Sequence, residues 1–253
     1  MPKGTGMRIF IIAVVVLVAG LAGGAALLPM SMAADMATRQ FPDFKFSEAS
    51  GSVWDGKLGK VSFGKQFIGD LAVKTELLSL LTGNAAGTLG LSREGFSGQA
   101  NINYGLGNGR VEVKDASVSG NTAMVPGMPA AIAKGDGKFT LKLADVKFTE
   151  GACAEAKGEV WTDALTKVNI HGWKGPELRG PVTCAGGNLN VEAGGKAETG
   201  EDVLAVMTIS QHLDMELTAT VSNASPGALQ ALAEVGFKPE GDKLVLRQAV
   251  GGK

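Results

Sequence analysis

The only two cysteines among the 253 residues, Cys153 and Cys184, are the side chains with the plainest chemistry. Their wide spacing is unlike the short Cys-x-x-Cys pairs that hold a zinc ion, so we predict no metal site. We expect a disulfide between them, which would close a loop of about 30 residues and stabilise the fold by roughly 3 kcal/mol. The alternative that the sequence leaves open is a pair of buried free thiols.

The polar side chains show no pattern typical of catalysis. The two histidines, His171 and His212, do not lie beside a Gly-x-Ser-x-Gly turn or a similar nucleophile. Phosphate-binding glycine loops, His-Glu-x-x-His zinc motifs and dinucleotide fingerprints are also missing from the sequence. The acidic pair Glu201-Asp202 lies in a turn-like polar stretch, where solvated carboxylates are expected. We therefore predict no catalytic residue, no cofactor-binding site and no enzyme activity.

The charge pattern argues against nucleic acid as a partner. The formal net charge is −1, and without Lys3 and Arg8 the remaining chain has 22 basic and 25 acidic residues. Both signs are interspersed, with no run of Lys or Arg that could neutralise a row of phosphates. We expect a solvated surface of mixed charge.

An apolar stretch near the N-terminus predicts a membrane anchor. Residues 9–28 are uncharged and largely apolar, which is long enough for a helix to span the hydrocarbon core of about 30 Å. Lys3 and Arg8 precede this stretch, so the positive-inside rule predicts a cytoplasmic N-terminus and an exported chain from Pro29 onward. Both cysteines then lie in an oxidising compartment, where disulfides persist.

A cleavable signal peptide is the alternative to an anchor. Ser31-Met32-Ala33 places small residues where a signal peptidase would cut. The apolar core of such peptides is usually about 7–15 residues, which is shorter than the stretch in this chain. The length favours a retained transmembrane helix.

The exported chain has the pattern of an all-β protein. It contains many short segments in which apolar and polar residues alternate, and glycine, present 37 times in the sequence, separates most of them. Such alternation is typical of antiparallel sheets with one face in the core and one in water. The expected strands are 44–46, 51–63, 67–74, 85–92, 96–104, 110–117, 138–148, 154–161, 167–172, 181–185, 189–193, 203–210, 213–221 and 243–247.

Three short helices are expected between these strands, at 76–81, 126–133 and 226–235. In the last one, Ser225 is placed to cap the helix, Pro226 occupies the first helical position and Gly236 can end it. Its residues Leu229, Leu232 and Ala233 share one face, which we expect to pack on the sheet.

A repeated motif suggests that the sheet has two similar halves. Gly51, Val53 and Trp54 recur as Gly158, Val160 and Trp161 at an offset of 107 residues, and a Pro-Gly, short helix and strand pattern recurs at an offset of 100. Glycine before Val-Trp permits a bend that turns the indole inward, so we expect both tryptophans to anchor the core.

The predicted organisation then has five parts. A cytoplasmic tail (1–8), a transmembrane helix (9–28) and a linker (29–43) precede two β-rich halves (44–150 and 151–253).

The order of these glycine, tryptophan and cysteine motifs resembles type II secretion system protein N, over nearly all of the exported part. The matching segments are 50–56 (SGSVWDG), 151–153 (GAC), 156–161 (AKGEVW) and 180–184 (GPVTC). The resemblance implies a single-pass protein of the bacterial inner membrane with a periplasmic domain. It also implies an accessory role beside the inner-membrane platform of the secretion machine, contacts with other secretion-system inner-membrane subunits, and no enzymatic activity.

The same family is also similar to AsmA-like proteins, in which a curved sheet forms an apolar groove for lipid. This resemblance implies a curved, mostly antiparallel sheet, and it suggests a second hypothesis, a β-groove module that binds or transfers lipid acyl chains in the envelope.

Overall fold

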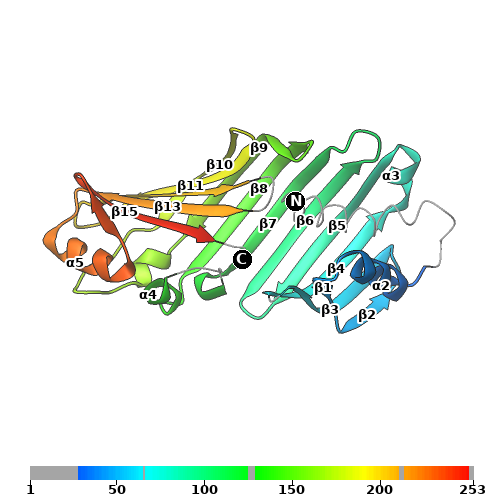
Figure 1. Cartoon of the computed structure of the whole chain (residues 1–253), viewed down its shortest axis with the longest axis horizontal. Helices are drawn as coiled ribbons and strands as arrows, with labels where there is room; N and C mark the ends of the chain where they lie inside the picture. The colour runs from blue at the N-terminus through cyan, green and yellow to red at the C-terminus, as the bar shows by residue number, and fades with distance from the viewer. Residues whose placement is uncertain (1–27, 65, 125–128, 211–213, 251–253) are drawn as a thin grey trace.

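A computed structural model describes residues 28–64, 66–124, 129–210 and 214–250. Within them the chain forms one open antiparallel sheet of fifteen strands, in the order β1-β3-β4-β5-β6-β7-β8-β9-β10-β11-β12-β13-β15-β14, with β2 pairing β3 (Figure 1). Almost every strand pairs with its neighbour in the sequence, as expected for segments joined by short turns. The prediction of a mostly antiparallel β protein is confirmed.

The strand bounds are β1 (Phe44–Lys45), β2 (Glu48–Gly51), β3 (Asp55–Phe63), β4 (Gln66–Glu76), β5 (Asn84–Arg93), β6 (Phe96–Gly105), β7 (Val111–Asn121), β8 (Lys138–Thr149), β9 (Ala152–Thr162), β10 (Leu178–Ala185), β11 (Asn188–Lys196), β12 (Asp202–Ile209), β13 (Met215–Ser222), β14 (Lys238–Glu240) and β15 (Lys243–Val250).

Few helices accompany the sheet. They are α2 (Met30–Gln40), α3 (Leu77–Leu81), α4 (Ala130–Ala133) and α5 (Pro226–Val235), with 3-10 turns at Thr122–Met124 and Ala164–Lys167. Figure 1 shows α2 and α3 at one end of the sheet and α4 and α5 at the other.

The caps of α5 are those that its sequence predicts. The Ser225 hydroxyl oxygen accepts a hydrogen bond from the Ala228 amide, proline follows at the first turn, and Gly236 closes the helix with φ 102°. The buried face differs from the expected one. Leu232 is buried as predicted, but Leu229 and Ala233 are exposed.

The predicted transmembrane segment lies outside the described residues except for Leu28. Among the residues that the structure does describe, none belongs to a helix with the length and apolar character needed to cross a bilayer. The membrane anchor therefore stays a prediction.

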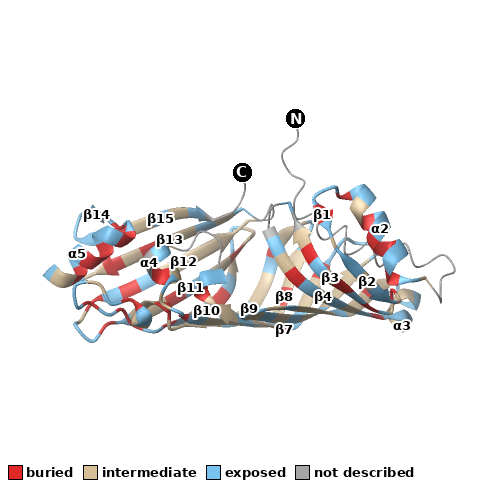
Figure 2. Cartoon of the chain, turned by 90° about the horizontal axis from the view of Figure 1, so that it is seen from below, coloured by how far each residue is buried: buried red, intermediate tan, exposed pale blue. Residues whose placement is uncertain are grey.

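The strand registers give the sheet one apolar and one polar face. Leu143 of β8 lies opposite Gly158 of β9, which lies opposite Val182 of β10. Adjacent residues in the same strands, such as Lys142 and Glu159, pair in the same way on the other face. Figure 2 shows that the helices α2, α4 and α5 lie on one side of the curved sheet.

Helices cover the apolar face at its two ends. At one end α2 places Met30, Ala34 and Ala37 against Leu58 and Val61 of β3. At the other end α4, α5 and the segment after β9 enclose a larger cluster over β11–β15. Between them lies a third cluster, built from strand residues alone.

Three local expectations were wrong. The expected strand 51–63 is interrupted by a corner at 52–54, so that β3 begins only at Asp55. Residues 167–172 form no strand, because Val168 and Trp173 turn inward and are buried against the cluster under α5. The stretch 29–43, expected as a linker, contains the helix α2, whose small alanines let it pack closely on the sheet.

The predicted division at residue 150 falls in the turn between β8 and β9. These strands pair from Thr149↔Ala152 to Phe139↔Thr162, so the sheet continues across the division. The origin of the chain from two related halves stays a prediction.

Candidate functional site

The two cysteines form the predicted disulfide. Cys153 in β9 and Cys184 in β10 are bonded, with 5.5 Å between their Cα atoms. The bond lies on the apolar face, packed with Val146, Val182 and Leu189. Free thiols, the alternative left open by the sequence, are therefore excluded, and the bond is a cross-link between two neighbouring strands.

The first copy of the repeated motif forms the corner between β2 and β3. Gly51 has φ 80°, and a Cβ atom there would lie 2.3 Å from the Asp55 carbonyl oxygen, so only glycine fits. Val53 is 1% exposed, and the half-buried Trp54 packs on the cluster formed by Val53 and Ala33. This tryptophan does pack inward.

The second copy has a different backbone setting, in the middle of β9. A Cβ atom on Gly158 would lie 2.5 Å from the Lys142 carbonyl oxygen and 2.8 Å from Cδ2 of Leu143. Glycine is needed here for close approach of β8 and β9. Val160 faces the apolar side, next to the cluster under α5.

Trp161 corrects the expectation of a second core anchor. It follows Val160 in an extended strand, so its side chain points to the opposite, polar face. The indole is half-buried there, and its Nε1 donates a hydrogen bond to Glu177 Oε2 at 3.0 Å. The second copy of the motif has the same residues as the first, but the alternation of side chains in β9 places its tryptophan on the polar face.

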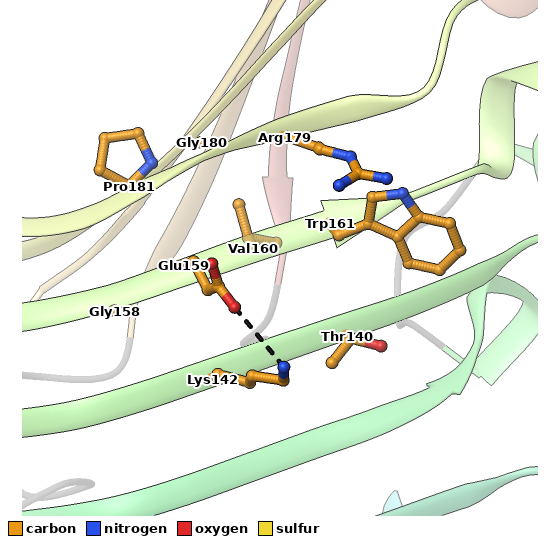
Figure 3. A pocket seen from close by; sticks show the side chains of 9 residues that line it. All are labelled: Thr140, Lys142, Gly158, Glu159, Val160, Trp161, Arg179, Gly180 and Pro181. Atoms are coloured by element: carbon orange, nitrogen blue, oxygen red, sulfur yellow. Dashed lines mark ion pairs between the residues drawn. The ribbon is translucent and has the colours of Figure 1, made fainter.

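Trp161 lines a hollow on this polar face. The hollow has a volume of about 680 Å³, and its walls come from three adjacent strands, β8, β9 and β10 (Figure 3). The register arranges its side chains in two rows, one of Lys142, Glu159 and Pro181, and one of Thr140, Trp161 and Arg179.

The charges around the hollow compensate one another. Lys142 Nζ lies 3.6 Å from Glu159 Oε1, and Arg179 Nη2 lies 3.2 Å from Glu177 Oε2. The Arg179 guanidinium also stands 6.0 Å from the centre of the Trp161 ring. Hydrogen bonds from Trp161 and from Arg179 hold the pKa of Glu177 below its ordinary value.

This arrangement is suited to recognition through stacking and hydrogen bonds. The Glu177 carboxylate stays ionised near neutral pH, because hydrogen bonds from Trp161 and Arg179 lower its pKa, and the Glu159 carboxylate faces the Lys142 ammonium. Of the nine lining residues only Thr140 carries a hydroxyl, and no histidine or cysteine stands among them. Sequence reasoning missed Arg179 and Glu177, since only the strand register brings them to Trp161.

The middle of the apolar face is the second candidate surface. Over β5–β9 many of its apolar side chains are only partly buried, unlike those beneath α2 and α5, although Ala116 and Val146 are buried there. The apolar residues concerned are Leu89, Leu91, Ile102, Val113, Val118, Leu141 and Leu143. We call these residues the open apolar face. A contiguous row of partly exposed apolar side chains is a candidate binding surface.

The remaining polar residues considered from the sequence lie apart from both surfaces. His171 Nε2 lies 2.6 Å from Oε1 of Glu234 on α5, and His212 lies outside the described residues. Glu201, expected to be solvated, is instead fully buried beside the start of α5, where its carboxylate accepts hydrogen bonds from the Ser225 hydroxyl and amide and from Thr199. Its role is to hold α5 in place.

One comparison with known proteins gives a match. The family described as "Type II secretion system (T2SS), protein N" matches residues 42–247, which cover nearly all of the sheet. No curated protein and no solved structure matches the chain significantly.

Proposed function

This chain belongs to the type II secretion system protein N family, and from this membership we propose an accessory, non-catalytic role in that machine. In this proposal residues 9–28 anchor the protein in the bacterial inner membrane, with the N-terminus in the cytoplasm. The sheet then lies in the periplasm, where it contacts other inner-membrane subunits of the system.

The observation that carries the proposal is the open apolar face. A soluble domain normally buries such side chains, because each fully buried Leu or Val contributes about 1.5–3 kcal/mol. Here Val118, Leu141 and Leu143 stay half-buried although the same face is well covered at both ends. A partner that covers these side chains would recover that free energy.

The disulfide supports the periplasmic placement. Disulfides form and persist in oxidising compartments such as the bacterial periplasm. The bond between Cys153 and Cys184 lies on the same side of the sheet as the open apolar face, in the cluster that contains Leu141 and Leu143. It therefore stiffens the surface that the proposal assigns to the partner.

Deletion of the gene tests the proposal. We expect reduced export of the substrates of the secretion machine, with export restored by the wild-type gene. Val118→Lys should restore it poorly, because it places a charge on the open apolar face, whereas Ser119→Lys, one residue away on the polar face, should restore it fully. Unchanged export after deletion, together with no copurifying secretion subunit, would overturn the proposal.

The open apolar face also favours a second candidate function, the binding of lipid acyl chains. Acyl chains would cover the same side chains without a protein partner. Native mass spectrometry of the gently purified protein distinguishes the two, because this candidate requires bound lipid. A spectrum of the bare chain alone would exclude it.

A further inference from the structure

Four leucines are exposed together at one end of the strands. They are Leu77, Leu78 and Leu81 of α3 (52%, 77% and 83% exposed) and Leu106 of the β6–β7 hairpin (39%). They make up four of the ten exposed large apolar side chains among the described residues, so they form a patch and are not scattered singly. We call these four side chains the leucine rim.

Polar contacts hold the leucine rim in place without burying it. The Ser79 hydroxyl donates to the Glu76 carbonyl oxygen at 2.6 Å and accepts from the Ala86 amide at 3.0 Å. The Leu106 amide donates to the Gly83 carbonyl oxygen at 3.0 Å, which joins the two loops. No residue of α3 is buried. Its leucines therefore contribute little to the packing of the described chain.

The leucine rim lies at the end of the sheet where the described chain begins. The Leu28 carbonyl oxygen accepts a hydrogen bond from the Val53 amide at 3.2 Å. The Val53 carbonyl oxygen in turn accepts one from the Thr75 hydroxyl at 3.0 Å, and Thr75 is two residues before α3. The last residue of the predicted membrane span is thus linked by two hydrogen bonds to the strand that leads into α3.

We infer that the leucine rim inserts into the periplasmic surface of the same bilayer that holds residues 9–28. This inference rests on the proposed function, since it takes that segment as the membrane anchor. A chain that leaves the bilayer at Leu28 has little room to carry this end of the sheet away from it. Leucines on a short helix are suited to the boundary between headgroups and acyl chains.

The contact is apolar in character. The charges beside the rim are Asp55 and Lys74, which lie opposite each other in β3 and β4, together with Glu76 and Arg110. Two acidic and two basic groups cancel, so attraction to anionic headgroups adds little. Insertion should not depend on the anionic lipid content.

Docking through the leucine rim would orient the sheet. The strands β5 and β6 have 10 residues each and begin or end at the rim, so they would extend about 33 Å from the bilayer. The helix α5 follows the opposite ends of the strands, and its Leu229 is also exposed, at 44%. Leu229 therefore provides a matched control that should stay in water.

Tryptophan fluorescence in the full-length chain tests the inference. The chain is reconstituted into phosphatidylcholine nanodiscs with plain or brominated acyl chains, and Leu78→Trp, Leu81→Trp and Leu229→Trp are compared with the wild type, whose three tryptophans give the background. We expect brominated lipid to reduce the added fluorescence of Leu78→Trp and Leu81→Trp about twofold, because the rim reaches the acyl boundary. The added fluorescence of Leu229→Trp should not change, and phosphatidylglycerol should not alter the result.

The outcomes separate this inference from the proposed function. A chain that does not incorporate into the discs contradicts the membrane anchor, and the rim contact fails with it. In a second outcome, the chain incorporates into the discs, but Leu78→Trp and Leu81→Trp are quenched no more than Leu229→Trp. The chain then has its membrane anchor, but the leucine rim does not contact the bilayer. That second result would overturn the inference alone, and it would point to a protein as the occupant of the rim.

Discussion

One end and the middle of the same apolar sheet face differ in how they are covered. Over β12, β13 and β15 the helix α5 packs on the sheet, so that Val221, Leu232 and Leu244 are almost fully buried. Over β7 and β8 the same alternation places Val118 and Leu143 on the same face, but they stay half-buried. Strand alternation thus decides which side chains share a face, and the covering helices complete the burial at its ends.

The largest expected effect comes from a buried leucine beneath α5. Leu232→Ala should lower the free energy of unfolding by about 3–4 kcal/mol, because it leaves a cavity in a closed core. Leu143→Ala on the open apolar face should cost about 1 kcal/mol, since its side chain remains partly in contact with water. Urea unfolding of both variants measures the difference. Equal losses would mean that the two regions are packed alike.

Removal of the disulfide should have the next largest effect. The double variant Cys153→Ala/Cys184→Ala should lose about 3 kcal/mol, because the bond restricts a long loop in the unfolded chain. Alanine keeps both positions apolar within their cluster. The measurement is the urea midpoint of the variant and of the wild type, each with and without reductant. A reductant effect of the same size in both proteins would contradict this account.

Glu201 should make the closed end sensitive to acid. Burial disfavours its charge, but hydrogen bonds from Ser225, Thr199 and backbone amides outweigh burial and hold its pKa below the ordinary value of 4.5. The resulting stabilisation is present above that value and is lost as the pH falls through the lower pKa of the folded state.

Glu201→Gln removes this titration. The variant should be about 1–3 kcal/mol less stable than the wild type at pH 7, since an amide is a weaker acceptor than a carboxylate. The gap should close as the pH falls below 4.5, because only the wild type loses the contribution of Glu201 there. Unfolding curves at several pH values measure it. A gap that stays constant would show that Glu201 is not the acid-sensitive group.

The smallest effect is expected on the polar face. Lys142 and Glu159 form an exposed ion pair at 3.6 Å, and such pairs contribute little in water. Lys142→Ala should therefore leave the urea midpoint unchanged, in contrast to Leu143→Ala at the next position. A clear loss for Lys142→Ala would mean that the hollow around Trp161 is part of the folded core.

Much of the fold follows from the sequence pattern, because each strand alternates and most turns contain glycine. The bounds of β5, β6, β8 and β12 lie within two residues of the expected ones. The caps of α5 and the disulfide were also predictable, since each depends on residue types with few alternative uses. The match over residues 42–247 assigns the chain to its family.

The helix α2 was missed because its sequence lacks the usual signals. Pro29 precedes it without a side-chain cap, and no acidic residue stands in its first turn. It is stabilised instead by packing, with Met30 and Ala34 fully buried on β3. Such tertiary contacts leave little trace in a single sequence.

The orientation of Trp161 depends on the strand register. A bulge between Leu143 and Asp145 shifts the pairing of β8 with β9, so that facing side chains cannot be assigned by counting alone. The two copies of the Gly-x-Val-Trp motif therefore differ, one at a corner and one within a strand. For the same reason, the sequence alone did not place Arg179 and Glu177 beside Trp161.

Site-specific photo-crosslinking in cells tests the central claim most directly. A photoreactive residue at Val118 lies on the open apolar face, and one at Ser119 lies on the polar face of the same strand. The account predicts that position 118 cross-links to an inner-membrane subunit of the secretion machine and that position 119 does not. Equal cross-linking from both positions, or none from position 118, would contradict it.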